Sequence, residues 1–572
     1  MKLKSLLIVA LIAPLFACQA PATRPPVPVA GTLASGKQDL PEIPLTEEVL
    51  YSLLLGEIAG HRGQFDVSVP ALGRAAQKTR DPRLAERAAL AALFARRPQE
   101  ALVNARLWVE LKPRSSEAHE ALAAALMETG LAKEARIHFE KILTLGAEAG
   151  LAQAYLRIAA TLGRQSNRAD ALDVMRALVR LHPDKAVAQY ALAHLAVRVS
   201  DLDAAMLAID RALDINPAWE DAALFKARVL VSLKDTPRTL QFYERYLEAH
   251  PRAGNMRLGY ARQLVDLKQW DKAREQFKRV VAAAPRDAEV VFTIALLALQ
   301  SNELDEAEQY LKRALELQPE NDQTRLYLGQ VAEQRKQYET AIEWYTRIES
   351  AELFFEAQAR LGVALARQGK LDQARVHLHN LLPKTEAQKV QRALAEEQIL
   401  RDAKQYTEAF DVLSRTLGEL PDNADLLYAR ALAAEKLNRV EVAERDLRRI
   451  LKKDPKNANA LNALGYTLAD RTTRYAEALT LIEQALALKP DDPFILDSLG
   501  WVHYRLGNHA EAVRHLRAAF NLRADAEIAA HLGEVLWVTG DRAGAESIWK
   551  SALKQAPDSE VLLGVISKFR GK

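Results

Sequence analysis

Small apolar residues recur at fixed offsets along most of this chain, and a proline closes many of the units. Between Ala186 and Trp219, Ala193 lies in one predicted helix, Ala205 opens a second, and Pro217 follows its end. Proline lacks a backbone N–H and cannot continue a helix, so it marks the point where each second helix has ended. Small residues are needed where two helices cross closely, since a larger side chain would separate them. The pattern therefore predicts a series of helical hairpins.

The predicted hairpins keep a constant length. Prolines recur at one fixed interval, and two later prolines return to the same register: Pro183, Pro217, Pro251, Pro285 and Pro319, then Pro421 and Pro455. A non-repeating helical bundle would not hold such a register. The interval, about 34 residues, is the period of the tetratricopeptide repeat. The chain resembles that family from about residue 49 to residue 559. The resemblance implies an all-α fold, a right-handed superhelix of about fifteen helix-turn-helix repeats within residues 46–572.

Three segments depart from the regular pattern. Glu47–Pro113 holds two degenerate repeats, as is common at the end of a solenoid, where a repeat caps the stack. Glu386–Lys404 carries Glu396 and Glu397 where small residues are expected, so it is the best candidate for a local break. Val561–Phe569 is expected to add a short final helix.

The composition suits a long helical solenoid. Hydrophobic residues make up 49% of the 572 residues and charged residues 27%. A chain of this length exceeds the usual size of a single globular core, but in a solenoid each repeat packs only on its neighbours. The formal net charge is +3, or +1 without the leader that contains Lys2 and Lys4, which argues against a nucleic-acid partner. A single cysteine excludes an intramolecular disulfide.

The N-terminal residues have the pattern of a secretory leader. Lys2 and Lys4 precede a short apolar segment, Leu6–Phe16, which is too short to span a bilayer. Leu15–Cys18 resembles the bacterial lipobox, whose cysteine becomes the lipidated first residue of the mature protein. Cys18 is the only cysteine of the chain and lies where the lipid would be attached. We therefore expect a lipoprotein signal peptide over residues 1–18, the alternative being a plain secretory signal that happens to contain a cysteine.

The segment after the cysteine predicts where the protein is held. Gln19 follows Cys18, rather than the aspartate associated with inner-membrane retention, so the sorting rules of bacterial lipoproteins imply the outer membrane. Several acyl chains on one cysteine would anchor the chain firmly, because each buried methylene adds ~0.8 kcal/mol. Residues 19–45 are rich in proline and cannot bury apolar surface, so we expect a disordered or extended spacer.

The sequence carries no sign of an enzyme. The repeats fill the chain, and it contains no Gly-rich phosphate loop, HExxH zinc motif or nucleophile elbow. We therefore predict no catalytic residue, no cofactor and no metal. Four histidines lie close together near the C-terminus, but the repeat pattern puts them on different helices and a turn, so they are not expected to converge on a metal: His503, His509, His515 and His531.

Binding of other proteins is the expected function. In the tetratricopeptide-repeat family the first helices line the concave face, and contacts come mainly from positions 2, 5, 9 and 12 of a repeat. Near the C-terminus these positions hold aromatic, Asn and Asp residues, and in the middle of the chain two equivalent arginines: Asn459, Asn462, Tyr466, Asp497, Trp501, Tyr504 and Trp537, with Arg228 and Arg262. Rings anchor partner side chains, while polar groups bind an extended backbone. The alternatives are rings packed between repeats and ordinary solvated arginines.

A more specific resemblance covers the C-terminal third. Leu461–Gly507 looks like the large tetratricopeptide lipoproteins of proteobacterial outer membranes. One branch of these acts as an adaptor for a periplasmic carboxyl-terminal processing protease, whose substrates include peptidoglycan cross-link hydrolases. The resemblance implies a periplasm-facing scaffold whose partners are such proteins and which meets the membrane only through its lipid. The alternative is a scaffold for polysaccharide export or for the assembly of another envelope complex.

Overall fold

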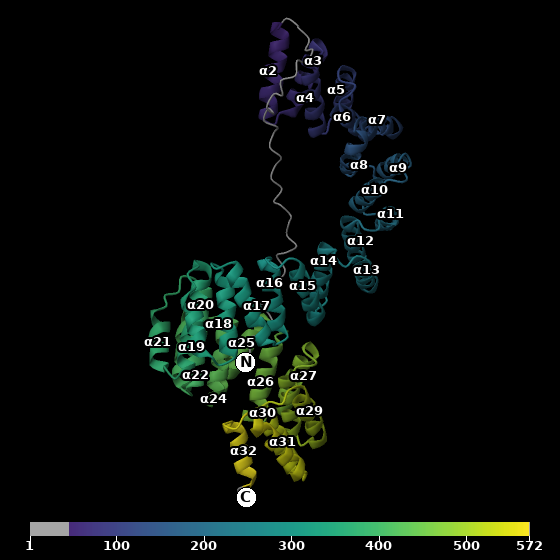
Figure 1. Cartoon of the computed structure of the whole chain (residues 1–572). Coiled ribbons are helices and arrows are strands. Elements are labelled where there is room, and N and C mark those ends of the chain that lie inside the picture. The colour runs from purple at the N-terminus through teal and green to yellow at the C-terminus, as the bar shows by residue number, and fades with distance from the viewer. Residues whose placement is uncertain (1–44, 571–572) are drawn as a thin grey trace. The chain divides into compact units, whose positions relative to one another are not determined.

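A computed structural model describes residues 45–570, and within this range the chain forms 31 α-helices and no strands (Figure 1). The helices follow one another as fifteen consecutive pairs and a final single helix, α32 (Glu560–Arg570), which confirms the expected repeat number and the short last helix. None of the helices in the described range has the length and apolar character needed to cross a membrane. The predicted leader, with Cys18, and the spacer up to residue 44 lie outside the described residues.

The chain divides into two compact units, the first ending at Asn302 and the second beginning at Glu303. The first unit contains α2 (Glu47–His61), α3 (Phe65–Thr79), α4 (Pro82–Phe94), α5 (Pro98–Leu111), α6 (Ser116–Glu128), α7 (Ala132–Leu145), α8 (Ala147–Leu162), α9 (Arg168–Val179), α10 (Ala186–Arg198), α11 (Leu202–Ile215), α12 (Glu220–Ser232), α13 (Thr236–Ala249), α14 (Gly254–Asp266), α15 (Trp270–Ala283) and α16 (Ala288–Gln300).

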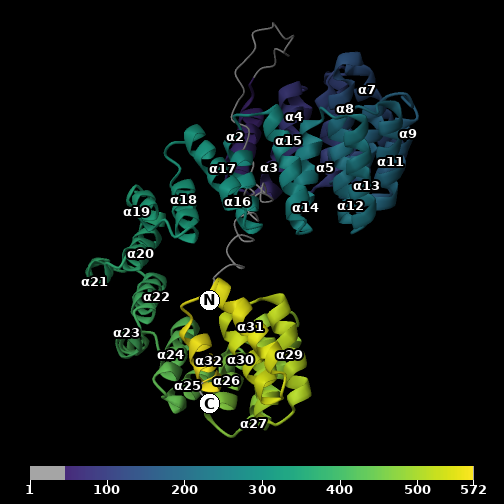
Figure 2. The ribbon, with the colours of Figure 1, turned by 60° about the horizontal axis from the view of Figure 1, so that its bottom comes forward.

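The second unit carries seven of the predicted binding residues, and Figure 2 shows its last helices, α29, α30, α31 and α32, lying together. It contains α17 (Leu304–Leu317), α18 (Asp322–Gln334), α19 (Tyr338–Thr346), α20 (Ala351–Arg367), α21 (Leu371–Asn380), α22 (Glu386–Asp402), α23 (Tyr406–Glu419), α24 (Ala424–Lys436), α25 (Val440–Lys453), α26 (Ala458–Arg471), α27 (Tyr475–Leu488), α28 (Pro493–Arg505), α29 (His509–Leu522), α30 (Ala526–Val538), α31 (Arg542–Gln555) and α32.

The connection inside a hairpin is made by one left-handed residue. Ser200, Lys234 and Lys268 have φ of 68°, 58° and 58°, and the same conformation recurs in the next two repeats at Asn302 (62°) and Lys336 (60°). The residue after the left-handed one can cap the second helix: Asp201 accepts a hydrogen bond from the N–H of Ala204 at 2.9 Å. A capping carboxylate satisfies an N–H that has no partner within the helix. The turns thus reverse the chain and start the next helix.

The connection between hairpins explains the proline register. An Asp or Asn lies two residues after each of five prolines, where it caps the next first helix: Asp287, Asn321, Asn423, Asn457 and Asp492. Asn321 and Asn423, for example, accept from the N–H groups of Thr324 and Leu426 at 3.0 Å. Proline ends one helix and the capping residue begins the next, so the pair fixes the boundary of the repeat.

Small residues lie at the helix crossings, as the sequence predicted. Ala193, Ala261 and Ala295 are fully buried. At Gly500 a Cβ atom would come within 2.5 Å of Leu516 Cγ on the paired helix, and at Gly533 within 1.9 Å of Trp549 Nε1. Real Cβ atoms do not approach other atoms so closely, so only glycine fits at these two crossings.

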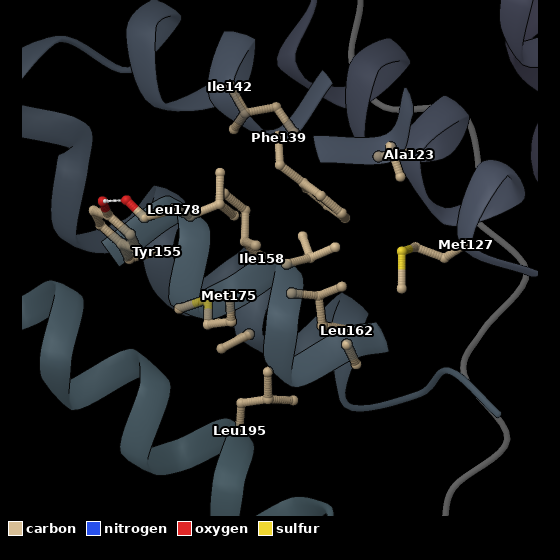
Figure 3. Close-up of a cluster of buried hydrophobic side chains, with 14 of the residues drawn as sticks. Ala123, Met127, Phe139, Ile142, Tyr155, Ile158, Leu162, Met175, Leu178 and Leu195 are labelled. Carbon is tan, nitrogen blue, oxygen red and sulfur yellow. Dashed lines mark hydrogen bonds between the residues drawn. The ribbon is translucent and has the colours of Figure 1, made fainter. Parts of the chain in front are cut away.

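Larger apolar residues from successive hairpins fill the space between them. Figure 3 shows such a cluster in the first unit, where Phe139 of α7, Ile158 of α8 and Met175 of α9 point toward one another. All three are buried, and the hydroxyl of Tyr155 donates to the carbonyl oxygen of Leu178 at 2.9 Å. The core is therefore a row of such clusters along the chain, in which each hairpin packs on its neighbours.

The expected break at Glu386–Lys404 is wrong. The segment forms a continuous helix, α22, which packs against α20, α23 and α24. Glu397, where a small residue was expected, is only 3% exposed, and its carboxylate binds Arg401 Nη1 at 2.9 Å one turn further along the helix. Burial raises the pKa of Glu397, while the charge of Arg401 opposes that rise. The ion pair lets the glutamate occupy the crossing without interrupting the stack.

Candidate functional site

Seven of the predicted binding residues lie on three successive first helices of the second unit. We call them the first-helix strip: Asn459, Asn462 and Tyr466 on α26, Asp497, Trp501 and Tyr504 on α28, and Trp537 on α30. The glycines at the crossings direct one face of each helix toward its paired second helix, as Gly500 does toward Leu516. The strip residues occupy other positions of the same helices, and two of them, Asp497 and Trp501, meet His531 on the next first helix.

Trp501 is the most enclosed ring of the strip. Only 8% of it is exposed, and its Nε1 donates to Asp470 Oδ1 at 3.2 Å. The ring stacks on His531 of α30, with centroids 4.3 Å apart and planes 25° from parallel. Tyr504 lies beside it, with centroids 5.2 Å apart. Trp501 thus joins α26, α28 and α30 by packing, which is the alternative that the sequence left open for these rings.

Asp497 and His531 form a buried pair beneath this ring. The Nδ1 of His531 lies 3.1 Å and 3.0 Å from the two carboxylate oxygens of Asp497. Burial by itself lowers the pKa of His531, but the charge of Asp497 and its hydrogen bond raise it, and the net direction is upward. The pair therefore favours a protonated imidazole that bridges α28 and α30. Asp497 holds this histidine rather than projecting freely from the strip.

Carboxylates on four successive first helices act electrostatically on the half-buried Tyr466. Burial raises the pKa of the Tyr466 phenol, and the charges of four carboxylates raise it further: Asp470, Glu527, Glu435 and Asp497. The ring centroid of Tyr466 lies 6.1 Å from that of His531. The pKa of Glu527 is also raised, mainly because the surrounding protein displaces water from its carboxylate. Its acidic neighbours raise this pKa further, while the charges of His531 and Lys436 lower it. Basic groups lie among these carboxylates: Arg471 is 3.6 Å from Glu435 and 3.0 Å from Asp470, and Arg505 is 3.9 Å from Asp470.

The remaining strip residues differ in their surroundings. Asn459 is exposed, and its Oδ1 accepts from Lys489 Nζ at 3.0 Å. The Oδ1 of Asn462 is buried and has no hydrogen-bond partner among residues 45–570. Tyr504 donates to Glu534 Oε1 at 3.5 Å, and the same oxygen lies 3.0 Å from Lys568 Nζ of α32.

Trp537 belongs to the end of the solenoid. Its ring lies 5.6 Å from that of Trp549 on α31 and 6.2 Å from that of Phe569 on α32, centroid to centroid. The guanidinium of Arg542 lies over the same ring at 5.2 Å. This ring therefore packs the last helices together, and it is not part of the group around Tyr466.

The two arginines lie in the first unit. Arg228 is exposed, and its guanidinium lies 5.6 Å from the ring centroid of Phe225. That ring stacks on His194, with centroids 4.1 Å apart, in a cluster that also contains Tyr190. Arg262 is half-buried, one repeat further along, on α14. The equivalent offsets of Arg228 and Arg262 thus place them on neighbouring first helices, α12 and α14.

The four clustered histidines have separate roles. His503 and His515 stack with centroids 5.6 Å apart, and His509 lies 5.8 Å from the ring of Tyr504. His531 is bound to Asp497. In the part of the chain that the structure describes, no group of three or more His, Cys, Asp or Glu side chains is arranged to hold a metal ion.

A separate cavity of about 650 Å³ opens between α21, α22 and α23. Charged and polar side chains line most of it: Arg375, Glu396, Glu408, Asp411, Ser414 and Arg415, with Val412. Arg375 and Glu408 form an ion pair there, with Nη2 and Oε2 2.7 Å apart. The cavity was not predicted, because it depends on how three helices of two successive repeats pack.

Sequence reasoning also missed the residues that complete the strip. Glu435 on α24, Asp470 on α26, and Glu527 and Glu534 on α30 lie at or next to the contact positions of their repeats, and His531 was considered only as a metal ligand. A scan for acidic residues at the contact positions of successive repeats would have found Glu435, Glu527 and Glu534, because these follow the repeat register.

Comparisons with known proteins agree with the fold. Family profiles described as tetratricopeptide repeat match residues 71–150, 156–219, 230–296, 292–352, 428–493 and 498–560, which together exceed half of the chain. A TPR repeat-containing protein of Pseudomonas aeruginosa is 42% identical to this chain over 491 residues. The alignment covers 86% of this chain and 82% of the Pseudomonas protein.

Two other similarities are more limited. Bacteriophage adsorption protein A of Escherichia coli is 35% identical over 98 residues, 17% of this chain and 10% of that protein. The crystal structure of a tetratricopeptide repeat protein from Parabacteroides merdae aligns with 49% of this chain, and the alignment includes 97% of that protein's chain. The sequence identity is 18% and the TM-score is 0.34. On the family profiles and the Pseudomonas relative, this chain belongs to the tetratricopeptide-repeat family, whose repeats serve as scaffolds that bind other proteins.

Proposed function

We propose that this protein is a periplasm-facing lipoprotein of the outer membrane and acts as an adaptor for a carboxyl-terminal processing protease. In this role it binds the protease and presents cell-wall hydrolases to it as substrates. The observation that carries the proposal is the resemblance of Leu461–Gly507 to the large tetratricopeptide lipoproteins of proteobacterial outer membranes. That stretch contains most of α26 and all of α28, the two helices that hold six of the seven strip residues.

Several strip residues are accessible to a partner. Trp501 and Asp497 are engaged in packing, whereas Asn459 is exposed and Tyr466 and Tyr504 are half-buried. The accessible parts of these side chains offer amide, phenol and ring surfaces to a partner, and the buried ones hold them in place. Aromatic anchors supported in this way are typical of protein interfaces.

The adaptor role can be tested with purified components. A purified carboxyl-terminal processing protease is incubated with a peptidoglycan cross-link hydrolase, with and without this protein. We expect degradation to be faster when the protein is present, and the protease to be recovered with it from crosslinked envelopes. The double variant Asn459→Ala, Tyr466→Ala should weaken the effect, whereas Thr480→Ala, an exposed change on α27, should not.

An unchanged rate of hydrolase degradation, together with crosslinking that recovers no protease, would reject the adaptor role. Recovery of polysaccharide-export proteins in the same experiment would instead favour the export scaffold that the sequence leaves as the alternative.

The proposed location is tested at Cys18. We expect Cys18→Ala to shift the protein from the outer-membrane fraction to an uncleaved or soluble periplasmic form, because the substitution removes the atom that carries the lipid. Fractionation in high salt measures this. A variant that still sediments with outer membrane at the wild-type level would show that something other than the lipid holds the protein there.

A further inference from the structure

The first described helix, α2, presents an apolar stripe that no other described helix covers. Tyr51, Leu54 and Ile58 follow one another at helical spacing, so they share one face. They are 65%, 51% and 50% exposed. Among the described residues, the extensive contacts of α2 are with α3 alone, across the crossing at Gly56 (Figure 1). Adjacent large apolar side chains exposed to this degree mark an interaction surface.

The same positions are buried in repeats further along the first unit. Counted from the small residue at the crossing, the stripe corresponds to three residues of α10 that are fully buried: Ala188, Ala191 and Leu195. Leu195 belongs to the cluster shown in Figure 3, together with Met175 of the preceding hairpin. No described helix precedes α2. Its stripe is therefore the face that, in an inner repeat, packs on another hairpin.

One charged residue lies at each end of the stripe. Glu47 opens α2, and Arg62 follows its last residue. Both side chains are exposed, and neither forms an ion pair within residues 45–570. Glu48, by contrast, is bound to Lys78 of α3. The apolar stripe is thus flanked by one acidic and one basic group that are both available to a partner.

The five positions are arranged symmetrically along α2. Glu47 and Arg62 are equally far from a midpoint just after Leu54, and so are Tyr51 and Ile58. When two such helices pack antiparallel about this midpoint, Glu47 of each lies opposite Arg62 of the other, and Tyr51 lies opposite Ile58. Antiparallel packing also brings opposite ends of the two helix dipoles together. The stripe is complementary to itself, as a two-fold interface requires.

We propose that the stripe of α2 is the interface through which two copies of this protein form an antiparallel dimer. Each copy covers the apolar side chains of the other, and the charges at the two ends pair between copies: Glu47, Tyr51, Leu54, Ile58 and Arg62. A stable dimer typically covers about 800 Å² on each partner, which is more than one helix face supplies. The dimer is therefore weak and reversible, with a Kd on the order of tens of micromolar.

Sedimentation of the Cys18→Ala protein, which has no lipid attached, measures this association over concentrations that span the expected Kd. We expect Leu54→Glu to weaken the dimer by about tenfold or more, because it places two like charges beside the two-fold axis. Leu207→Glu, the same change at a leucine of α11 that is 58% exposed, is the control and should leave the dimer unchanged. Both variants should melt as the parent does, because the replaced side chains are exposed.

Exchange of the end charges tests the antiparallel direction. Arg62→Glu should weaken the dimer, because it sets acidic residues opposite each other at both ends, and the addition of Glu47→Arg should restore it. A short bis-maleimide should join two copies that carry Leu54→Cys in the Cys18→Ala protein. It should not join two copies that carry Glu47→Cys, since these residues lie at opposite ends of the helix pair, about 22 Å apart.

Three outcomes would overturn the proposal: a protein that stays monomeric at every concentration, a dimer that Leu54→Glu leaves intact, or crosslinking at Glu47→Cys in place of Leu54→Cys. A monomer that melts at a lower temperature when it carries Leu54→Glu would mean that the same chain covers the stripe. The adaptor role does not depend on dimerisation and is judged separately by the protease assay.

Discussion

At the scale of single residues, Gly533 is the glycine of the described chain that leaves least room for a side chain. A Cβ there would lie 1.9 Å from Trp549 Nε1. We expect Gly533→Ala to lower the free energy of unfolding by about 1–3 kcal/mol, because overpacking displaces the tryptophan. Urea unfolding followed by circular dichroism measures the change. Gly564→Ala, in α32 with nothing within 4 Å of its added methyl group, should instead stabilise by about 0.5–1 kcal/mol. Equal losses at both positions would contradict the close packing at Gly533.

The Asp497–His531 pair predicts a pH dependence. The net effect of its surroundings raises the pKa of His531 above its ordinary value of 6.5, so the folded protein binds the proton more tightly than the unfolded chain. The stability that the pair contributes is complete below about pH 6.5 and is lost as the pH rises through the folded pKa.

Thermal melts from pH 5.5 to 9 would measure this contribution as the difference between wild type and His531→Gln. We expect the difference to shrink as the pH rises. Asp497→Asn should remove the same pH-dependent part, because it leaves the histidine without its counter-charge. A difference that grows with pH would mean that burial, and not the charge of Asp497, determines the direction in which the pKa of His531 is shifted.

At the scale of helices, Trp501 connects α26, α28 and α30. We expect Trp501→Ala to lower stability by about 3–5 kcal/mol, because it leaves a cavity beside His531 and an unmade hydrogen bond at Asp470. Phe494→Ala, on the same helix but 40% exposed, should cost much less. Melting curves and partner binding are both measured. Lost binding with an unchanged melt would mean that Trp501 contacts the partner and does not pack the repeats.

The helices themselves could be predicted from the sequence, and most contacts between repeats could not. The prolines and small residues gave the hairpin register, because each acts within one repeat or at one crossing. The pair Asp497–His531 joins residues 34 apart, and the register alone does not say which side chains meet. At Glu397 the prediction of a break failed because Arg401, one turn away, compensates the buried charge. The helices that carry the strip residues could therefore be predicted, while the pairs of side chains that meet between them could not.

At the scale of the whole molecule, stability should be distributed along the chain. A truncated chain that ends after Pro455 keeps α25 complete and loses one interface between repeats, whereas one that ends after Ala443 leaves only the first turn of α25. We expect the first truncation to have the higher helix content per residue and the sharper thermal melt by circular dichroism. Identical melts would contradict the assigned repeat boundaries.

The mainly local pattern of contacts has a mechanical consequence. The extensive helix contacts join elements one or two apart in the chain, and the ion pair between Lys404 and Glu560 is an exception that spans 156 residues. A pull applied to the two ends is therefore carried by the hairpins in series, and the weakest one yields first. Each hairpin that opens releases roughly 110 Å of extended chain. Under tension the protein would lengthen in even steps, and it would shorten again one repeat at a time when the load is removed.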